Sequence, residues 1–287
     1  MNAHDTLRIV LTLECENRVG IVFAVAGFLA EYGCDIVDSQ QFDDSRGNRF
    51  FMRVEAVSPG NHEVEYLKAQ FDPVAASFGM KWHLGEKRHK LRTLIMVSHA
   101  DHCLNELIEL WQSQLLNIEI VAVVSNHDTL RNVAERSGVD FHHIPVTPQS
   151  KSQAESALVS LIQETGAELV VLARYMQILS TDLCATLKGK VINIHHSFLP
   201  GFKGARPYHQ AFDRGVKVIG ATAHYVTADL DEGPIIDQSV FHVDHRAGPQ
   251  DLAVAGRRAE RTALAQAVAW HADRRIFVNG LRTVIFD

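Results

Sequence analysis

Two polar side chains at the end of a predicted strand have the chemistry of acyl-group reactions. The stretch 191–200 starts with branched apolar residues around Asn193, reaches His195 and ends in a proline-bounded turn, which predicts a buried strand followed by a turn. Residues two apart project from the same face of a strand, and ligands bind at the C-terminal ends of strands in open α/β sheets. An amide N–H can stabilise an oxyanion, and an imidazole can transfer a proton near neutral pH. The alternative is an Asn that caps a turn beside a surface histidine.

A later acidic loop offers a carboxylate for the same chemistry. It spans residues 228–234, contains Asp229 and Asp231, and leads into another predicted strand. Both aspartates are also ordinary turn formers, and only the fold can bring either of them to His195. His224 lies near the end of the strand predicted over 216–227, where it is either a partner of the site or an ordinary strand histidine.

Composition limits the class of protein. The chain has 287 residues, of which 46% are hydrophobic and 22% charged, as expected for a globular core of one large or two smaller domains. The net charge of −6 argues against a nucleic-acid-binding surface. No apolar run follows Met1, and none approaches the ~20 residues of a membrane span. We therefore expect neither nucleic acid nor a membrane as a partner.

Cysteine and histidine spacing argues against a metal site. The four cysteines lie far apart and form no CxxC motif, which is typical of free thiols in a reducing cytoplasm. None of the 16 histidines has a convincing metal-ligand spacing. We therefore expect a cytoplasmic protein without a bound metal.

The first part of the chain predicts a small α/β sandwich. Strands are expected over 7–13, 34–42, 49–57 and 80–84, and helices over 20–31 and 63–78, with Pro73 marking a bend or a boundary. The order βαββαβ is that of a ferredoxin-like domain. We assign this domain to residues 1–84 and a charged linker to residues 85–91.

The remainder, residues 92–287, predicts a doubly wound, mostly parallel sheet, because strands alternate with helices. The expected strands are 92–98, 118–125, 141–143, 169–173 and 191–194, followed by 216–227 and a strand after residue 234, and the expected helices are 102–114, 129–137, 152–165, 181–187 and 251–271. The first strand–helix turn, 98–104, has no glycine. Phosphate cradles need bare backbone at such a turn, so this argues against a phosphate-bearing substrate there, unless the loop is merely different.

The N-terminal region resembles an ACT domain, a small regulatory module that often binds an amino acid and pairs its sheets edge to edge. The resemblance lies in residues 13–22, 28–30, 33–38 and 50–53. Where the family usually has Asp and Pro before the first helix, this chain has Asn17 and Val19. The resemblance implies a small amino-acid effector and self-association, as a homodimer or homotetramer. The alternative is a role in oligomerisation alone.

The second region resembles the folate-dependent formyltransferases, from about residue 91 to the C-terminus. The motif Asn193-x-His195 with residues 197–200 matches together with the later segment 230–235. Residues 172–180 look like the family's folate-pocket strand and loop, although Gln177 stands where the family often has a basic residue. An ACT module ahead of this domain, with residues 101–104 and 204–208, is similar to the formyltetrahydrofolate deformylase branch.

That resemblance implies hydrolysis of 10-formyltetrahydrofolate to tetrahydrofolate and formate, which supplies formate for purine synthesis and balances one-carbon folate pools. Asn193 and His195 would stabilise the oxyanion, Asp231 would orient the imidazole and hold or deprotonate the water, and His195 would protonate N10. No cofactor is implied, because the folate is the substrate. The implied substrate-binding residues are Tyr175, Met176, Gln177, Ile178, Leu179, Gly204, His224, Ala228, Leu230 and Gly233.

Two other functions stay open at this point. The first is a transferase that delivers the formyl group to an amine such as glycinamide ribonucleotide, against which the missing glycine loop counts. The second is a non-catalytic amino-acid sensor that uses the ACT module beside an inactive second domain. The presence of Asn193, His195 and Asp231 together argues against the sensor.

Overall fold

The computed structural model describes residues 7–59, 62–199 and 207–287. Its contacts divide the chain into two compact units, the first made of residues Met1–His89, Asp273–Asn279 and Val284–Asp287 and the second of the remainder. The domain limits expected from the sequence, 1–84 and 92–287, stay a prediction. Near the C-terminus, residues Asp273–Asn279 and Val284–Asp287 group with the first unit, not with the second. Each unit is described below by itself.

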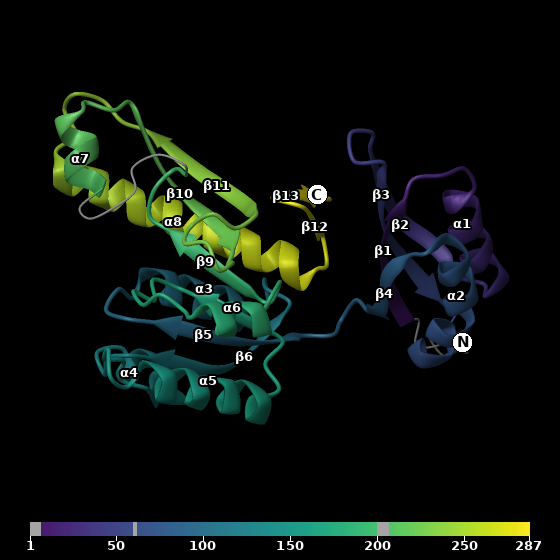
Figure 1. The fold of residues 1–287 in the computed structure, drawn as a ribbon, viewed down its shortest axis with the longest axis horizontal. Helices are drawn as coiled ribbons and strands as arrows, with labels where there is room; N and C mark the ends of the chain where they lie inside the picture. The colour runs from purple at the N-terminus through teal and green to yellow at the C-terminus, as the bar shows by residue number, and fades with distance from the viewer. Residues whose placement is uncertain (1–6, 60–61, 200–206) are drawn as a thin grey trace. The chain divides into compact units, whose positions relative to one another are not determined.

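The first unit has the predicted ferredoxin-like order. Its elements are β1 (Leu7–Glu16), α1 (Ile21–Glu31), β2 (Asp35–Asp44), β3 (Arg49–Ser58), α2 (Val64–Phe78) and β4 (Lys81–Glu86). They form an antiparallel sheet in the order β2-β3-β1-β4, with α1 and α2 beside it (Figure 1). Helix α2 continues past Pro73 to Phe78, so of the two expected alternatives, a bend or a boundary, the boundary is wrong. Strand β2 is an edge strand and is largely exposed.

The period-two pattern of β1 explains which side of this sheet faces the helices. Ile9, Leu11 and Leu13 belong to the same buried cluster as Phe71 of α2, whereas the intervening Val10 and Thr12 do not. Side chains alternate between the faces of a strand, so the neighbouring positions point away from this core. Burying one face of a sheet against helices is the usual solution for such a pattern.

Two short strands near the C-terminus were not predicted from the sequence. Strands β12 (Ile276–Asn279) and β13 (Arg282–Ile285) pair with each other. Phe277 and Phe286 pack against the fully buried Phe51 of β3, in a cluster separate from the helix-covered core. The terminal segment thus covers an aromatic side chain that the sheet would otherwise expose.

The second unit is the predicted doubly wound α/β domain. Its elements are β5 (Leu91–Val97), α3 (His102–Gln112), β6 (Ile118–Ser125), α4 (Arg131–Arg136), β7 (Phe141–His143), α5 (Lys151–Thr165), β8 (Leu169–Leu172), α6 (Thr181–Thr186), β9 (Val191–His195), α7 (Pro207–Asp213), β10 (Val218–Tyr225), β11 (Ile235–His242) and α8 (Pro249–Ala272). The strand order is β11-β10-β9-β8-β5-β6-β7. Strands β5 to β9 are parallel, and β10 and β11 extend the sheet in antiparallel pairings.

This strand order places a switch point between β5 and β8. The chain runs outward from β5 through β6 to β7, then returns to β8 on the other side of β5. At such a point the connections that leave the two adjacent strands run in opposite directions. Ligands bind in the resulting crevice at the carboxyl ends of the strands. Side chains of α5 and α6 pack on one face of the sheet, and α3 and α8 lie on the side of β5 and β6 opposite α4 and α5 (Figure 1).

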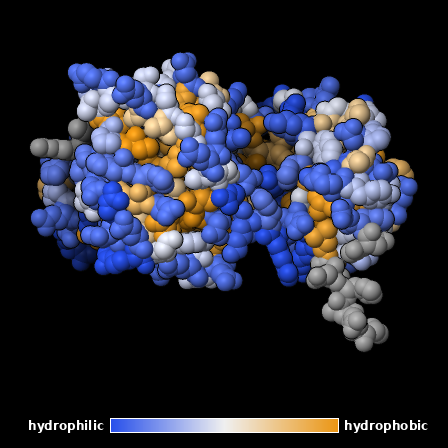
Figure 2. Space-filling model, turned by 90° about the horizontal axis from the view of Figure 1, so that it is seen from below, coloured by the Kyte–Doolittle hydropathy of each residue, from blue (hydrophilic) through white to orange (hydrophobic). Residues whose placement is uncertain are grey.

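The surface is mixed in character. On the face shown in Figure 2, hydrophilic residues cover much of each unit and apolar patches lie between them. Among the helices of residues 7–59, 62–199 and 207–287, none combines the length and the apolar character that a membrane span requires.

Candidate active site

A cavity of about 300 Å³ lies at the ends of β8 and β9 and beside the loop that follows β10. This volume is at the lower end of the ~300–1,000 Å³ typical of ligand pockets. The expected residues that line it are Asn193, His195, Asp231, Tyr175, Met176, Gln177, Ile178, Leu179, His224, Ala228 and Leu230. Two expected residues do not: Gly233 is buried behind the loop, and Gly204 lies outside the described residues.

Two further polar residues line the same cavity and were missed in the sequence analysis. They are Arg174, directly after β8, and His196, directly after β9. The rule that ligands meet the carboxyl ends of parallel strands could have found both. Their neighbours Tyr175 and His195 were predicted from the resemblance to the formyltransferases.

An ion pair between His195 and Asp231 is the centre of the site. The distance from His195 Nδ1 to Asp231 Oδ2 is 3.2 Å, and the two side chains are only 9% and 18% exposed. The hydrogen bond from His195, followed by the contact with His224, holds the pKa of Asp231 far below the usual aspartate value. Since an ionised carboxylate can only accept, Nδ1 of His195 carries the proton.

The other ring nitrogen of His195 is therefore the one that the described residues leave without a partner. Nε2 is buried and has no hydrogen-bond partner among the described residues. In the neutral imidazole this nitrogen is the proton acceptor, and in the imidazolium it is a donor. The low pKa of Asp231 makes its carboxylate a weak base, so of the two roles left open by the sequence, holding the water suits Asp231 better than deprotonating it.

Strand register brings His224 to Asn193. In the antiparallel pairing of β9 with β10, His224 lies opposite Asn193, and Asn193 Nδ2 is 3.2 Å from His224 Nε2. His224 Nδ1 donates to the carbonyl of Tyr225 at 3.0 Å. Nε2, which also lies 3.7 Å from Asp231 Oδ1, accepts from the Asn193 amide in the neutral tautomer that this leaves. This bond fixes the orientation of the amide and leaves one N–H of Asn193 for another partner.

The backbone around Asp231 is held in an uncommon conformation. Asp231 has φ +58°, a left-handed geometry that Asp tolerates better than most residues. Two residues later, a Cβ on Gly233 would lie 1.7 Å from the carbonyl oxygen of Tyr225, and Tyr225 N donates to Pro234 O at 2.9 Å. The absence of a side chain at Gly233 thus lets the loop fold back on β10 and return Asp231 to the histidines.

The loop after β8 is tied down by buried polar groups. Met176 N donates to Ser98 Oγ at 3.0 Å, and Ser98 Oγ donates to Asn126 Oδ1 at 2.6 Å. Ser180 N donates to Glu155 Oε1 at 2.8 Å. These bonds hold the two ends of the loop while Met176 stays 59% exposed. An exposed apolar side chain at the rim of a pocket is typical of a site for a partly apolar ligand.

Burial sets the charge of two other groups in the cavity. Burial, followed by the positive charge of Arg174 and by His195, lowers the pKa of His196 to about 4. Burial, followed by Glu155, raises the pKa of Tyr175 to about 12. Both side chains are therefore uncharged at neutral pH, and Arg174 remains a permanent cation.

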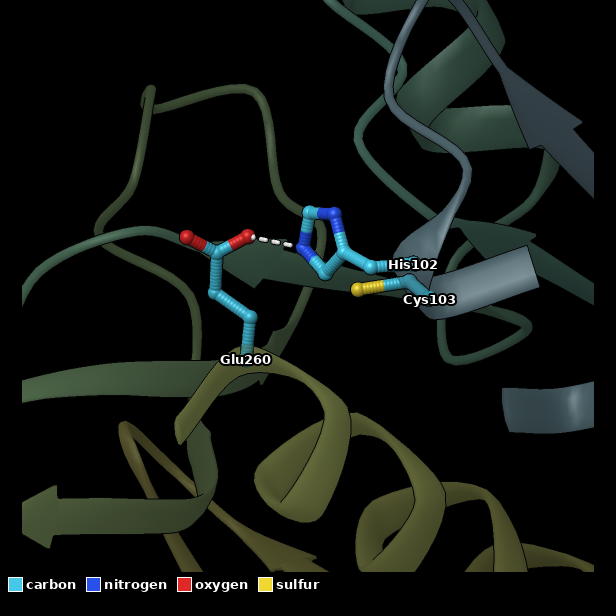
Figure 3. Close-up of side chains that lie close together, drawn as sticks. All are labelled: His102, Cys103 and Glu260. Atoms are coloured by element: carbon cyan, nitrogen blue, oxygen red, sulfur yellow. Dashed lines mark hydrogen bonds and ion pairs between the residues drawn. The ribbon is translucent and has the colours of Figure 1, made fainter. Parts of the chain in front are cut away.

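Behind Arg174 lies a second cluster made of His102, Cys103 and Glu260, whose ligand-type atoms lie within 4.8 Å of one another. Figure 3 shows the Glu260 carboxylate turned toward the His102 ring, with Cys103 beside them. His102 Nε2 lies 2.7 Å from one carboxylate oxygen, and Tyr208 Oη donates to the other at 2.8 Å. The cation Arg174 already lies beside the carboxylate, with Nε 3.4 Å from Glu260 Oε2. Burial keeps the pKa of the Cys103 thiol well above its normal value. The donors fit a self-satisfied network better than a metal cage.

Two family models match the chain. The model described as formyl transferase matches residues 91–268, and the model described as ACT domain matches residues 9–65.

Similar proteins span nearly the whole length. A protein from Corynebacterium sp. (strain P-1) that is named formyltetrahydrofolate deformylase is 52% identical to this chain. The match covers 98% of this chain and 99% of that protein. The crystal structure of formyltetrahydrofolate deformylase from Burkholderia mallei has a TM-score of 0.95 and 46% identity, covering 98% of this chain and 100% of that one. Glycinamide ribonucleotide transformylase 1 from Symbiobacterium toebii has a TM-score of 0.66 and 30% identity, covering 71% and 98%.

The role of Gly233 yields a first prediction. Replacing Gly233 with Ala should destabilise the protein by ~1–3 kcal/mol, as overpacking does, because the new Cβ meets the Tyr225 carbonyl at 1.7 Å. It should also shift the NMR signals of the His195 ring, since Asp231 is displaced. Chemical denaturation gives the free energy of unfolding. Gly248→Ala, where the nearest atom is 3.7 Å away, is the control and should change stability by less than ~0.5 kcal/mol. Unchanged stability and His195 signals in Gly233→Ala would contradict this role.

Proposed function

The chain belongs to the formyltetrahydrofolate deformylase family, and from this premise we propose that it hydrolyses 10-formyltetrahydrofolate to tetrahydrofolate and formate. The relatives that carry this name match it over nearly the whole length. We propose further that the formate supplies purine synthesis and that the reaction balances one-carbon folate pools. Four free, buried cysteines support a reducing, cytoplasmic location.

One observation carries the proposed mechanism: ionised Asp231 binds Nδ1 of His195 and leaves Nε2 unpartnered at the cavity. Nε2 takes a proton from water as the water oxygen attacks the formyl carbon. Asp231 stabilises the imidazolium that forms and keeps the ring in the required tautomer. General base catalysis by a positioned imidazole contributes ~100–10,000-fold to a rate.

Asn193 stabilises the negative charge that develops on the formyl oxygen. Its amide is oriented by the hydrogen bond to His224, and its second N–H is available to that oxygen. Removing one such donor typically costs ~100–1,000-fold in rate. His224 is a positioning residue in this scheme, because it acts through Asn193 and Asp231.

The proton balance of the reaction closes with these groups. When the C–N10 bond breaks, the imidazolium returns its proton from Nε2 to N10, so that tetrahydrofolate leaves as the neutral amine. The formic acid that forms loses its proton to solvent and leaves as formate. Each step uses a residue of this chain, and we propose no metal and no cofactor beyond the folate substrate.

The tethered loop after β8 and the loop 226–231 are proposed to bind the pterin and formyl ends of the folate. Both line the cavity, and Met176, Ile178 and Leu230 give it an apolar rim with exposed fractions of 59%, 60% and 58%. Apolar walls with a few convergent polar groups suit an aromatic, partly polar ligand.

For the first unit we propose a small amino-acid effector and self-association, as a homodimer or homotetramer. Two observations support association through its sheet. Strand β2 is an edge strand of 10 residues, and its Ile36, Val37 and Phe42 are exposed by 37%, 47% and 44%. Unpaired edges with apolar side chains tend to pair with another strand.

The reaction itself is tested without an acceptor. Purified full-length protein given 10-formyltetrahydrofolate and no amine should release tetrahydrofolate and formate in equal amounts, because water is the acceptor. Both products can be followed by absorbance and by a formate assay. Product formation that depends on added glycinamide ribonucleotide would replace hydrolysis with transfer.

Asp231→Asn should keep the fold and folate binding but lose turnover by ~100-fold or more, in the range typical of a general acid or base. Asn keeps the shape and tolerates the positive φ of this position, while the charge that fixes the imidazole is lost. The kcat and the folate dissociation constant are measured separately. Asp182→Asn, an exposed aspartate on α6 that does not line the cavity, is the control and should keep its kcat. Turnover of Asp231→Asn within about tenfold of wild type removes Asp231 from the mechanism.

Assembly gives another prediction. Light scattering of the full-length chain should show at least a dimer, and Val37→Lys should lose one level of assembly, because a charge on an edge strand opposes pairing. Val22→Lys, on helix α1 of the same unit and 40% exposed, should leave the mass unchanged. A monomeric wild type, or equal effects of the two variants, would rule out association through β2.

A further inference from the structure

Arg174 stands in the cavity wall in a conformation that costs energy. It follows β8 with φ +66°, which is uncommon for a residue with a long side chain. Of the five non-glycine residues with positive φ in the described part of the chain, two, Arg174 and Asp231, line this cavity. Such strain persists where the surroundings fix it, and it clusters at functional sites.

Glu260 of α8 holds one edge of the guanidinium. Arg174 Nε lies 3.4 Å from Glu260 Oε2, and Glu260 is only 1% exposed. Burial disfavours the carboxylate, but the hydrogen bond from His102 and the charge of Arg174 together leave the pKa of Glu260 below its usual value. Glu260, itself oriented by His102 (Figure 3), is thus an ionised partner beside the Nε edge of the guanidinium, an ion pair in which Arg174 Nε makes no hydrogen bond to the described residues.

The other edge of this guanidinium is unused. The two η nitrogens of Arg174 make no hydrogen bond within the part of the chain that the structure describes. The side chain is 19% exposed and lines the same cavity as His195 and Asp231. Among the described lining residues Arg174 is the one lysine or arginine, so it is the permanent positive charge of the cavity.

We propose that Arg174 is the binding group for the formate anion that hydrolysis releases, an inference that rests on the proposed function. The η edge of a guanidinium matches the two oxygens of a planar carboxylate. Formate is formed beside the ionised carboxylate of Asp231, which repels it. Arg174 offers the opposite charge within the same cavity.

His196 fits this arrangement. It lines the cavity and its ring stacks on that of His195 at 4.9 Å between centroids. Because it is buried near Arg174, its pKa lies at about 4, so it places no second positive charge beside the guanidinium. A small anion that leaves the catalytic pair therefore finds one permanent cation among the described lining residues, Arg174, which is paired with Glu260 on its Nε side.

Formate inhibition tests the proposal. Turnover of 10-formyltetrahydrofolate by the full-length protein is measured with added sodium formate, with sodium chloride to keep ionic strength constant. Formate should inhibit wild type, and its inhibition constant should rise by about tenfold or more in Arg174→Met, because charge-assisted hydrogen bonds are lost. Arg174→Lys should lie between the two, since it keeps the charge without the fork. Arg136→Met, which removes an exposed arginine of the same unit that bonds only its own helix, should match wild type.

A direct binding measurement keeps the test independent of turnover. The NMR signal of ¹³C-formate should broaden with wild-type protein and with Arg136→Met, less with Arg174→Lys and least with Arg174→Met. Equal formate inhibition and broadening in wild type and in the folded Arg174 variants would overturn the proposal. Inorganic phosphate or chloride competing as well as formate would overturn it too. If wild type releases no formate from the folate, the proposed function fails, whereas loss of formate binding in the Arg174 variants can still be seen.

Discussion

The ion pair between His195 and Asp231 is the interaction on which the rest of the site depends. Two partly buried groups 3.2 Å apart settle each other's protonation: the aspartate stays ionised, the imidazole keeps its proton on Nδ1, and Nε2 is left for chemistry. Ion pairs in such surroundings are costly to bury and need further hydrogen bonds. His224, whose Nε2 lies 3.7 Å from Asp231 Oδ1, adds a second contact, and the turn at Gly233 with the left-handed backbone of Asp231 places the carboxylate there.

The way in which the sheet is extended explains how these groups meet. Parallel strands bring Asn193 and His195 to the carboxyl edge, where the switch point leaves room for a ligand. The antiparallel β10 then lays His224 directly opposite Asn193, a pairing that a further parallel strand with its crossover would not give in so short a stretch of chain. The turn after β10 then sends the chain back along β11 and brings Asp231 to His195 and His224.

Buried polar networks, rather than apolar packing alone, fix the parts of the site that lie on loops. Ser98 and Asn126 hold the backbone of Met176, and Glu260 holds Arg174. An unsatisfied polar group in such a place would cost ~1–3 kcal/mol. A loop that satisfies these groups in one conformation only is therefore held in that conformation.

Much of this protein was determined by the sequence itself, because the periods of strands and helices are local. They predicted both folds to within a few residues at most element ends, and the i, i+2 spacing of Asn193 and His195 put both side chains on one face. Resemblance added Asp231, which spacing alone would have left as a turn residue. The tertiary structure decided the rest: the bond of His224 to Asn193, the anchoring of Arg174 by Glu260, the packing of the two C-terminal strands on Phe51, and the place of Gly233 behind the cavity instead of in its wall. Each of these depends on strand register or on contacts between residues far apart in the chain, and no local pattern of residue types encodes such contacts.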